Sequence, residues 1–349
     1  MPFSPRRMLI ALIGTVVLAF PFGLASPASA QTKIKFVLNW KYQGPQGMFF
    51  LAEDRGYYRA EGLEVTIDQG NGSGAAVPLV ANGTYDAGFG DINAIIQQAA
   101  QKPGEQPVMV YQIYSRPPFV LVTKADGPIK AVKDVEGQTL GGPPGSATLR
   151  LFPSFAKING IDTSRVQILN MAPNLQEQML IQGQVAGSLV FNVTSYINLL
   201  QQRQDPDKDF RWFNFGDYGL DLYSNGLMVS PKLLKENPKA VAGLVKASNR
   251  ALKEVLANPD EGIATLLKVE PLLNGNIEKQ RIAYALKNLM ISPENAEIGF
   301  GDLNDDRLAR SVGVIVEAYE LPRKPAVAEI FNRSFLPPKS ERQIGAKMN

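Results

Sequence analysis

Short apolar runs typical of buried strands alternate with helical patterns along this chain, and the series runs twice. In the first series, apolar residues recur at helical spacing between the first four strand patterns, and Pro117-Pro118 separates the last two. These strand patterns cover residues 34–38, 63–67, 87–90, 108–113 and 119–122. Because a helix between two strands returns the chain to the same end of a sheet, the alternation favours parallel pairing. We therefore expect an α/β fold with a mainly parallel sheet and helices on both of its faces.

A second series of strand and helix patterns begins near residue 134 and ends near residue 215. Segments 79–91 and 179–192 share one order of features, namely a helix end, a glycine, a strand and a polar residue. The polar residues are Asp91 and Asn192. This internal similarity predicts two lobes of one architecture. From about residue 238 onward, three apolar stripes at helical spacing predict core-facing helices.

The composition excludes several kinds of chemistry. The chain of 349 residues contains neither cysteine nor histidine. It therefore lacks the residues for a disulfide framework, a thiolate nucleophile, a Ser-His-Asp site or a Cys- or His-ligated metal. A net charge of only +3 argues against nucleic-acid binding, which needs a strongly basic surface. We expect no catalytic residue, no metal and no cofactor.

The first 30 residues form a pattern of their own. Arg6 and Arg7 precede a long apolar run, and an Ala-Ser-Ala sequence ends at Ala30. A basic start, an apolar middle and small residues at the end are typical of a secretory signal peptide. A membrane anchor is the alternative, but the apolar run is short for a span and contains Pro21. We therefore predict a periplasmic protein whose signal peptide, residues 1–30, is cleaved after Ala30.

Two glycine-rich turns open helices, one in each series. Residues 70–75 read Gly-Asn-Gly-Ser-Gly-Ala, and residues 145–148 read Gly-Ser-Ala-Thr. Free backbone N–H groups and a hydroxyl at such an opening can hold an anion or a carbonyl, and the two openings can face each other across a cleft. A helix N-cap explains Ser73 equally well. The first turn also fits a dinucleotide fingerprint in outline, but it follows the second strand rather than the first.

Other candidates follow strand ends, where ligands bind in parallel sheets. Trp40 can stack on a planar ligand or pack in the core. We assign Asp91 and Asn192 to matching places in the two series, where each can select a ligand amine or cap the next helix. Tyr114 and Ser115 lie where the chain approaches the second series.

Several motifs also occur in a fixed order between about residue 33 and residue 322. They are Asn39-Trp40, Ala52-Glu53, Gly56-Tyr57-Tyr58, Glu61-Gly62-Leu63-Glu64-Val65, the stretch 83–88 and the loop 142–146. In this set the chain resembles the periplasmic solute-binding proteins of ABC importers with the type II fold. The most similar group takes in the thiamine-pyrimidine-precursor, sulfonate, taurine and nitrate binders.

Two departures bear on the ligand. The pyrimidine-binding members carry a histidine six residues after the tryptophan, where this chain has Gln46. Gln46 can still donate and accept hydrogen bonds. The related eukaryotic enzyme that makes the thiamine pyrimidine uses a histidine and a Cys-rich motif. Neither is present in this chain, so the resemblance does not extend to that synthase activity.

The resemblance implies two lobes with a ligand cleft between them. We place one lobe at residues 31–124 and 222–336, the other at residues 125–221, and a mobile tail at residues 337–349. Closure about two chain crossings would enclose a solute and present it to a membrane ABC permease. The protein is expected to be a monomer.

The expected ligand contacts come from both lobes. They are Asn39, Trp40, Gln46, Ser73, Gly74, Asp91, Tyr114, Ser115, Gly145, Ser146, Ala147 and Asn192. A pyrimidine-like heterocycle, a sulfonate, a nitrate-like anion and an aromatic carboxylate all fit such a site. Two other functions are compatible with the sequence: an enzyme of related fold that acts on a small heterocycle, and a periplasmic sensor subunit that signals to a receptor.

Overall fold

The computed structural model describes Met1 and residues 31–343. The predicted signal peptide and residues 344–349 of the predicted tail lie outside the described residues. The described residues from Gln31 onward form one compact unit that contains both sheets. Within the described residues, no helix is both long enough and apolar enough to cross a bilayer.

The first of two sheets has five strands in the order β2-β1-β3-β10-β4. Its strands are β1 (Thr32–Val37), β2 (Leu63–Asp68), β3 (Ala87–Asp91), β4 (Val108–Gln112) and β10 (Asn225–Val229). β1 pairs in parallel with β2 and β3, whereas β10 runs antiparallel to β3 and β4. Phe36 and Val37 of β1 lie in two different hydrophobic clusters, since successive side chains of a strand point to opposite faces. Both faces of this sheet are therefore covered.

The second sheet also has five strands, in the order β7-β6-β8-β5-β9. Its strands are β5 (Phe119–Lys124), β6 (Thr139–Gly142), β7 (Gln167–Asn170), β8 (Gly187–Phe191) and β9 (Phe210–Asn214). β6 pairs in parallel with β7 and β8, and β5 runs antiparallel to β8 and β9. The two sheets therefore have one topology. We call the parts built on them the first half and the second half.

The two sheets and their flanking helices confirm the predicted α/β fold, with two differences in detail. Each sheet is mixed rather than parallel throughout. In the first sheet β10, which follows a crossing from the second half, is antiparallel to its neighbours, and in the second sheet β5, which follows a crossing from the first half, is antiparallel to its neighbours. The domain prediction assigned residues 119–124 to the first lobe, but β5 pairs within the second sheet. Pro117 and Pro118, which have no backbone N–H for a ladder, lie in the connection between β4 and β5, and β5 then pairs with β8 and β9.

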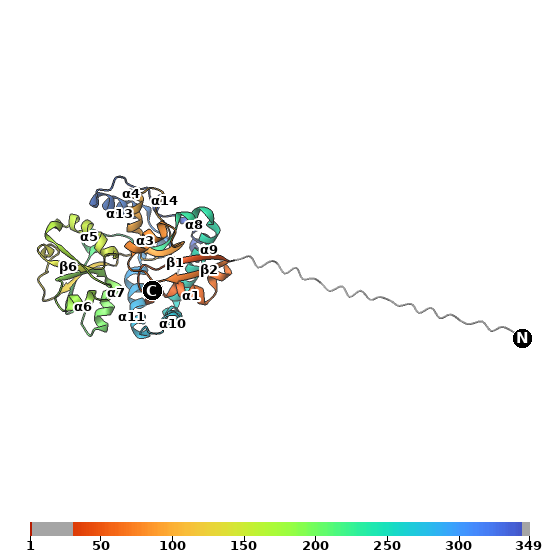
Figure 1. The fold of residues 1–349 in the computed structure, drawn as a ribbon, viewed down its shortest axis with the longest axis horizontal. Helices are drawn as coiled ribbons and strands as arrows, with labels where there is room; N and C mark the ends of the chain where they lie inside the picture. Colours follow the sequence, from red (N-terminus) through yellow and green to blue (C-terminus); the bar gives the residue numbers. More distant parts are fainter. Residues whose placement is uncertain (2–30, 344–349) are drawn as a thin grey trace. The chain divides into compact units, whose positions relative to one another are not determined.

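Helices surround both sheets (Figure 1). In the first half they are α1 (Gly47–Asp54), α2 (Tyr57–Ala60), α3 (Ser73–Ala81) and α4 (Ile92–Gln101). In the second half they are α5 (Ala147–Ile158), α6 (Gln176–Ile181) and α7 (Asn192–Gln201). The C-terminal helices are α8 (Pro231–Glu236), α9 (Pro238–Ala257), α10 (Pro259–Val269), α11 (Gly275–Ala285), α12 (Pro293–Ile298), α13 (Asp305–Ala318) and α14 (Val327–Ile330). Leu244 of α9, Ile282 of α11 and Leu308 of α13 are buried in the hydrophobic clusters, as their helical spacing predicts.

The predicted internal similarity is visible in the backbone. The strand–helix unit β3–α4 has a counterpart of the same length in β8–α7. Each residue of β8–α7 has a number one hundred higher than its counterpart in β3–α4. Gly83 and Gly183, which precede these strands, have φ angles of +76° and +70°. Only glycine adopts this left-handed conformation without strain. The same turn therefore leads into the same strand and helix in both halves.

The chain crosses between the halves through residues 113–118 and 215–224. The two crossings lie side by side, because Tyr114 N–H donates to Asn225 O at 2.8 Å and Ser224 N–H donates to Tyr114 O at 3.2 Å. The buried Gln112 side chain donates to Tyr114 O at 2.9 Å and to Ser224 O at 3.2 Å. The two crossings are thus joined by one set of buried hydrogen bonds.

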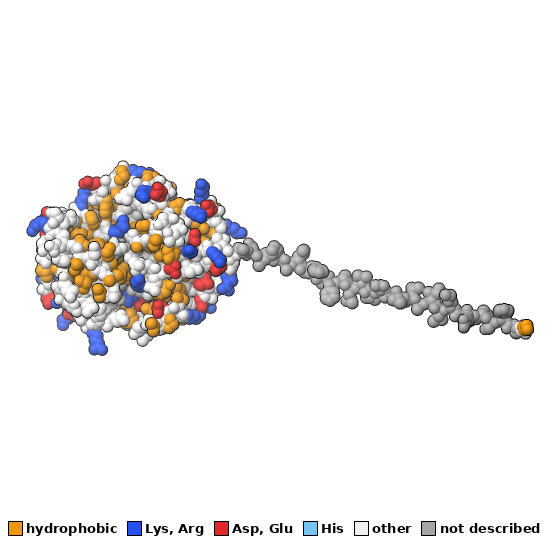
Figure 2. Space-filling view, viewed as in Figure 1, with side chains coloured by type: hydrophobic (Ala, Val, Ile, Leu, Met, Phe, Trp, Pro, Cys, Tyr) orange, Lys and Arg blue, Asp and Glu red, His pale blue; other side chains and the backbone are white. Residues whose placement is uncertain are grey.

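The described part of the predicted tail is packed against the protein. Arg342 is 5% exposed, and its guanidinium donates to Pro337 O and Phe300 O, each at 2.8 Å. These bonds from a buried cation anchor residues 337–342, so this part of the predicted tail is not mobile. Elsewhere on the surface, basic and acidic side chains are interspersed over the face shown in Figure 2, as the small net charge predicts.

Candidate functional site

A cavity with an empty volume of about 490 Å³ lies between the two halves. The first half and the first crossing contribute Asn39, Trp40, Gln43, Pro45, Gln46, Gly72, Ser73 and Tyr114. The second half contributes Ser146, Ala147, Gln176, Val190, Phe191, Val193 and Thr194. The cavity lies where β1, β6 and β8 end, which is the edge of an α/β sheet that usually binds ligands.

Seven of the twelve predicted contact residues line this cavity. They are Asn39, Trp40, Gln46, Ser73, Tyr114, Ser146 and Ala147. Trp40 and Tyr114 supply aromatic surface. Burial raises the pKa of Tyr114, so its phenol stays protonated and can donate a hydrogen bond to a ligand.

Two buried polar atoms in the cavity wall lack hydrogen-bond partners in the described part of the chain. They are Ser73 Oγ and Gln46 Oε1, which belong to residues 1% and 3% exposed. Gln46 Nε2 points toward Asn39 Oδ1 at 3.5 Å, which leaves Oε1 as a free acceptor. An unpaired buried polar group costs roughly 1–3 kcal/mol, so both atoms are suited to a bound molecule.

The two serines at the helix openings have different roles. Ser146 Oγ accepts from Leu149 N–H at 3.0 Å and caps α5, so its hydroxyl hydrogen and one lone pair remain for a ligand. Ser73 is the first residue of α3, and Gly72 occupies the N-cap position without a side-chain cap. The alternative of an N-cap role for Ser73 is therefore wrong.

The two helix openings face each other, as predicted, but they are in direct contact. Gly74 N–H donates to Gly145 O at 2.9 Å. A Cβ atom at Gly72, where φ is +110°, would lie 1.9 Å from Gly145 O. The absence of side chains thus lets the two backbones meet. Gly74 and Gly145 join the halves beside the cavity and do not line it.

Asp91 is buried next to the second crossing rather than in the cavity wall. Asn93 Nδ2 donates to Asp91 Oδ1 at 2.9 Å and to Tyr223 O at 2.7 Å. Burial raises the pKa of Asp91 to about 7, because a low-dielectric site disfavours the charged form. The counterpart of Asp91 is Phe191 rather than Asn192, since β3 and β8 end at these two residues. The predicted match with Asn192 was therefore wrong by one residue.

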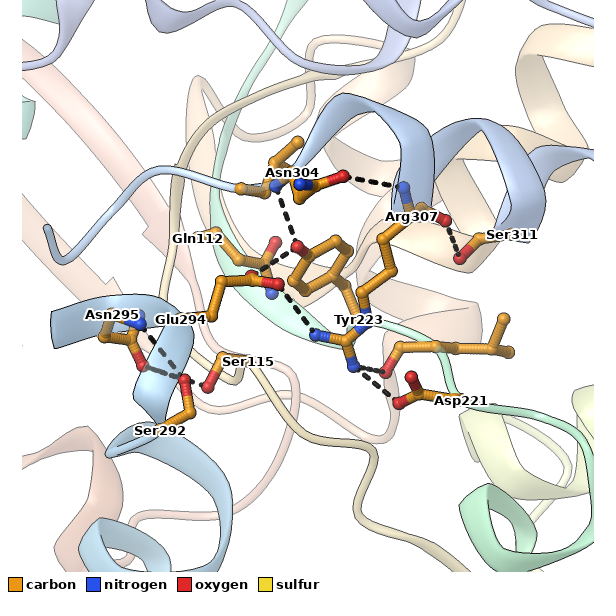
Figure 3. Close-up of polar contacts among 12 residues, drawn as sticks. Gln112, Ser115, Asp221, Tyr223, Ser292, Glu294, Asn295, Asn304, Arg307 and Ser311 are labelled. Atoms are coloured by element: carbon orange, nitrogen blue, oxygen red, sulfur yellow. Dashed lines mark hydrogen bonds and ion pairs between the residues drawn. The ribbon is translucent and has the colours of Figure 1, made fainter. Parts of the chain in front are cut away.

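Ser115 anchors the first crossing to α12 (Figure 3). Its hydroxyl lies 3.1 Å from Asn295 Oδ1 and 3.3 Å from Leu289 O. With Asn192, it borders a separate open hollow of about 1,370 Å³ of empty volume. Ser115 and Asn192, which we predicted as ligand contacts, border this hollow and are not among the residues that line the cavity.

The second crossing is attached to the same helix. Tyr223 Oη donates to Glu294 Oε1, and Asn304 N–H donates to Tyr223 Oη at 2.8 Å. The Arg307 guanidinium lies 4.1 Å from the centre of the Tyr223 ring and donates to Asp221 at 2.7 Å. Figure 3 shows these side chains converging on the second crossing. Because Glu294 and Asn295 are adjacent, one short helix holds both crossings.

The sequence analysis missed eight residues of the cavity wall. They are Gln43, Pro45, Gly72, Gln176, Val190, Phe191, Val193 and Thr194. Two of them could have been found from the internal similarity. Gln176 opens α6 as Ser73 opens α3, and Phe191 ends its strand as Asp91 does. Gly72 belongs to the glycine-rich turn already described, and no pattern in the sequence marks the remaining five.

Comparisons with known proteins agree with this geometry. A model of the family described as NMT1/THI5 like matches residues 46–262. The riboflavin-binding protein RibY of Chloroflexus aurantiacus is 25% identical over 295 residues, which are 83% of this chain and 82% of that protein. The 4-amino-5-hydroxymethyl-2-methylpyrimidine phosphate synthase THI13 of Saccharomyces cerevisiae is 23% identical over 254 residues, 70% of this chain and 73% of the enzyme.

A solved structure shares the fold. The alkanesulfonate-binding protein SsuA of Xanthomonas axonopodis pv. citri, bound to MOPS, superimposes with a TM-score of 0.65. The match covers 87% of this chain and 99% of SsuA at 16% identity. The arrangement of two sheets is therefore that of type II periplasmic binding proteins.

Proposed function

Since this chain belongs to the NMT1/THI5-like family, we propose that it is a solute-binding protein that delivers a small organic solute to a membrane ABC permease. The observation that carries the proposal is the cavity between the halves, to which both halves contribute. Inside it, the unpaired Gln46 Oε1 and Ser73 Oγ are placed to bond a guest. Binding proteins among the similar proteins support this function.

The lining favours an uncharged, planar heterocycle. None of the residues that line the cavity is Lys, Arg, Asp or Glu. Trp40 and Phe191 offer aromatic faces, and the amides of Asn39, Gln46 and Gln176 offer both donors and acceptors. An anion would meet only neutral donors in this lining and no cation to balance its charge, which favours the heterocycle over a sulfonate, a nitrate-like anion or a carboxylate. The similarity to a riboflavin-binding protein fits this preference.

Delivery requires export and a hinge. The predicted signal peptide at residues 1–30 would place the protein in the periplasm. There we expect it to act as a monomer. The crossings at residues 113–118 and 215–224 would serve as the hinge, because they are the two connections between the sheets. N-terminal sequencing of the secreted protein tests the first point, with Gln31 as the expected first residue.

The binding function is tested with a single-tryptophan protein. The chain has two tryptophans, and Trp212 donates to Pro206 O at 2.8 Å away from the cavity. Trp212→Phe leaves Trp40 as the reporter. Riboflavin and 4-aminopyrimidine are the neutral probes, and MOPS, nitrate and benzoate are the anionic ones. We expect a neutral probe to change the emission of Trp40 and, at about 100 times Kd, to stabilise the fold by about 2.7 kcal/mol.

The same experiment separates binding from catalysis. The similarity to a synthase makes an enzyme the second candidate. A probe recovered unchanged after incubation supports the binding function, whereas a probe that is consumed supports the enzyme. Binding of the anions alone would contradict the heterocycle preference.

A further inference from the structure

We propose that Arg281 is a positioning residue that holds the two halves closed around the cavity, an inference that rests on the proposed binding function. Arg281 lies on α11, outside the cavity wall, and is 2% exposed. No sequence motif marks it, because its partners on α7 lie more than eighty residues away along the chain.

Arg281 reaches from α11 to the first two turns of α7 in the second half. Its guanidinium donates to Thr194 O at 3.0 Å, to Val193 O at 3.3 Å and to Asn198 Oδ1 at 3.0 Å. Val193 and Thr194 line the cavity. We call these three bonds the Arg281 latch.

A buried acid connects the latch to the cavity wall of the first half. Glu278 pairs with Arg281 Nε at 3.1 Å on the same helix. It also accepts from Gly44 N–H at 2.7 Å. Gly44 begins the short helix Gly44–Gln46, whose Pro45 and Gln46 line the cavity. The ion pair therefore ties a wall segment of the first half to a wall segment of the second half.

The arrangement allows the latch to open without leaving a buried charge alone. Glu278 and Arg281 are three residues apart on one helix, so their pairing survives separation of the halves. Only the three bonds to α7 are exchanged for bonds to water. Because bonds from a charged donor are stronger than neutral ones, they favour the closed arrangement. If a ligand binds only the closed protein, its apparent affinity is proportional to the fraction of protein that the latch keeps closed.

A second bond at the same boundary lies next to the latch. Thr194 Oγ1 lies 3.4 Å from Gln43 Oε1, and both residues line the cavity. This neutral contact is long and weak. The charge-assisted bonds of Arg281 are therefore the main polar link at this wall.

The test uses spin labels, since the chain has no cysteine of its own. Lys41→Cys and Asn174→Cys place labels on exposed residues of opposite halves, each close in sequence to a residue of the cavity wall. Pulsed electron paramagnetic resonance then gives the distribution of distances between the two labels in protein without ligand.

The latch variant is Arg281→Gln with Glu278→Gln, because removing the arginine alone would leave a buried carboxylate unpaired and prevent folding.

We expect the labelled wild-type protein to show a short-distance population. In the double variant, the ratio of closed to open protein should fall about ten- to a hundredfold. Arg281→Lys keeps the charge and should give an intermediate ratio. Lys279→Gln is the matched control, since it removes one charge from an exposed position of α11, and it should leave the distribution unchanged.

A double variant with the wild-type distribution would overturn the inference, and so would a wild-type protein that shows no short-distance population. The proposed function is judged separately with riboflavin. If wild-type protein binds riboflavin, the double variant should release it faster by the same factor, and equal release rates would also overturn the latch. If no probe binds but the distances shift, the latch stands and the proposed ligand class falls.

Discussion

The units β3–α4 and β8–α7 share one backbone but differ in what their strand ends do. In the first half, Asp91 ends the strand and is buried with Asn93 beside the second crossing. In the second half, Phe191 ends the strand, lines the cavity and packs on Phe119 with ring centres 5.6 Å apart. The first unit thus supports the connection between the halves, and the second builds the binding cavity.

The comparison shows that two units with the same backbone can place residues of different function at the same position. A carboxylate at a strand end needs hydrogen bonds and is drawn toward polar neighbours, whereas a phenyl ring there can form an apolar wall. The second half has its own buried acid, Glu177, at a different place. It accepts from Ser195 Oγ at 2.5 Å and from Gln176 Nε2 at 2.9 Å, and burial raises its pKa.

The largest expected effect concerns Asp91 and pH. Its folded-state pKa of about 7 exceeds the value of about 3.9 for an unfolded chain. The folded protein therefore holds the proton more tightly, and the stability from Asp91 is full below pH ~4 and is lost as the pH rises through 7. Asp91→Asn should remove this loss. The difference in the free energy of unfolding between the variant and wild type should therefore shift in favour of the variant by roughly 2–4 kcal/mol from pH 4 to pH 8.

Urea unfolding of both proteins at pH 4, 6 and 8 measures this effect. Parallel stability profiles of wild type and Asp91→Asn would show that Asp91 does not titrate in this range. The cavity should be unaffected, so the Kd for the best probe at pH 6 should stay within about twofold.

Phe191→Ala tests the other member of the comparison. Loss of an aromatic face from the cavity should weaken binding of a neutral probe by about 2 kcal/mol, or roughly thirtyfold in Kd. Isothermal titration with riboflavin or 4-aminopyrimidine measures it. Unchanged affinity in a folded variant would remove Phe191 from the site and leave the two strand ends functionally alike.

Ser73→Ala is expected to separate stability from binding. The hydroxyl is buried without a partner among the described residues, so its removal should stabilise the free protein by about 0.5–1 kcal/mol. The same change should weaken probe binding by roughly tenfold, because a ligand loses a hydrogen bond. Thermal unfolding with and without probe reports both values, and a destabilised variant with intact binding would contradict the role of Ser73.

The smallest effect is expected for Asn192→Ala. Asn192 follows Phe191 directly but borders the open hollow outside the cavity. Its replacement should change the Kd by less than about twofold. A tenfold loss of affinity would move the site toward the crossings and restore Asn192 as the counterpart of Asp91.

Much of the fold could be predicted from local patterns. The alternation of strands and helices predicted the α/β class, and the recurrence around Gly83 and Gly183 predicted two halves of one topology. The assignment of residues 119–124 to the first lobe did not hold, because a strand pattern does not show which sheet it joins. Pairing with β8 rather than β4 is a contact between distant segments.

The sequence by itself determined which residues stand at strand and helix ends, and this brought Trp40, Ser73 and Ser146 into the predicted site, whereas Gln46 entered through the family resemblance. It also determined that no thiol or imidazole chemistry is available. Such features depend on neighbours within a few residues and on composition.

Only the tertiary structure decided which of these ends face a cavity. Burial beside the second crossing removes Asp91 from it, and the backbone contact of Gly74 with Gly145 fills space that a ligand would need. Arg281 and Thr194 likewise meet only because the halves close on each other. The physical reason is that local propensity fixes an element and its ends, whereas burial and hydrogen bonding depend on segments that the fold brings together from far along the chain.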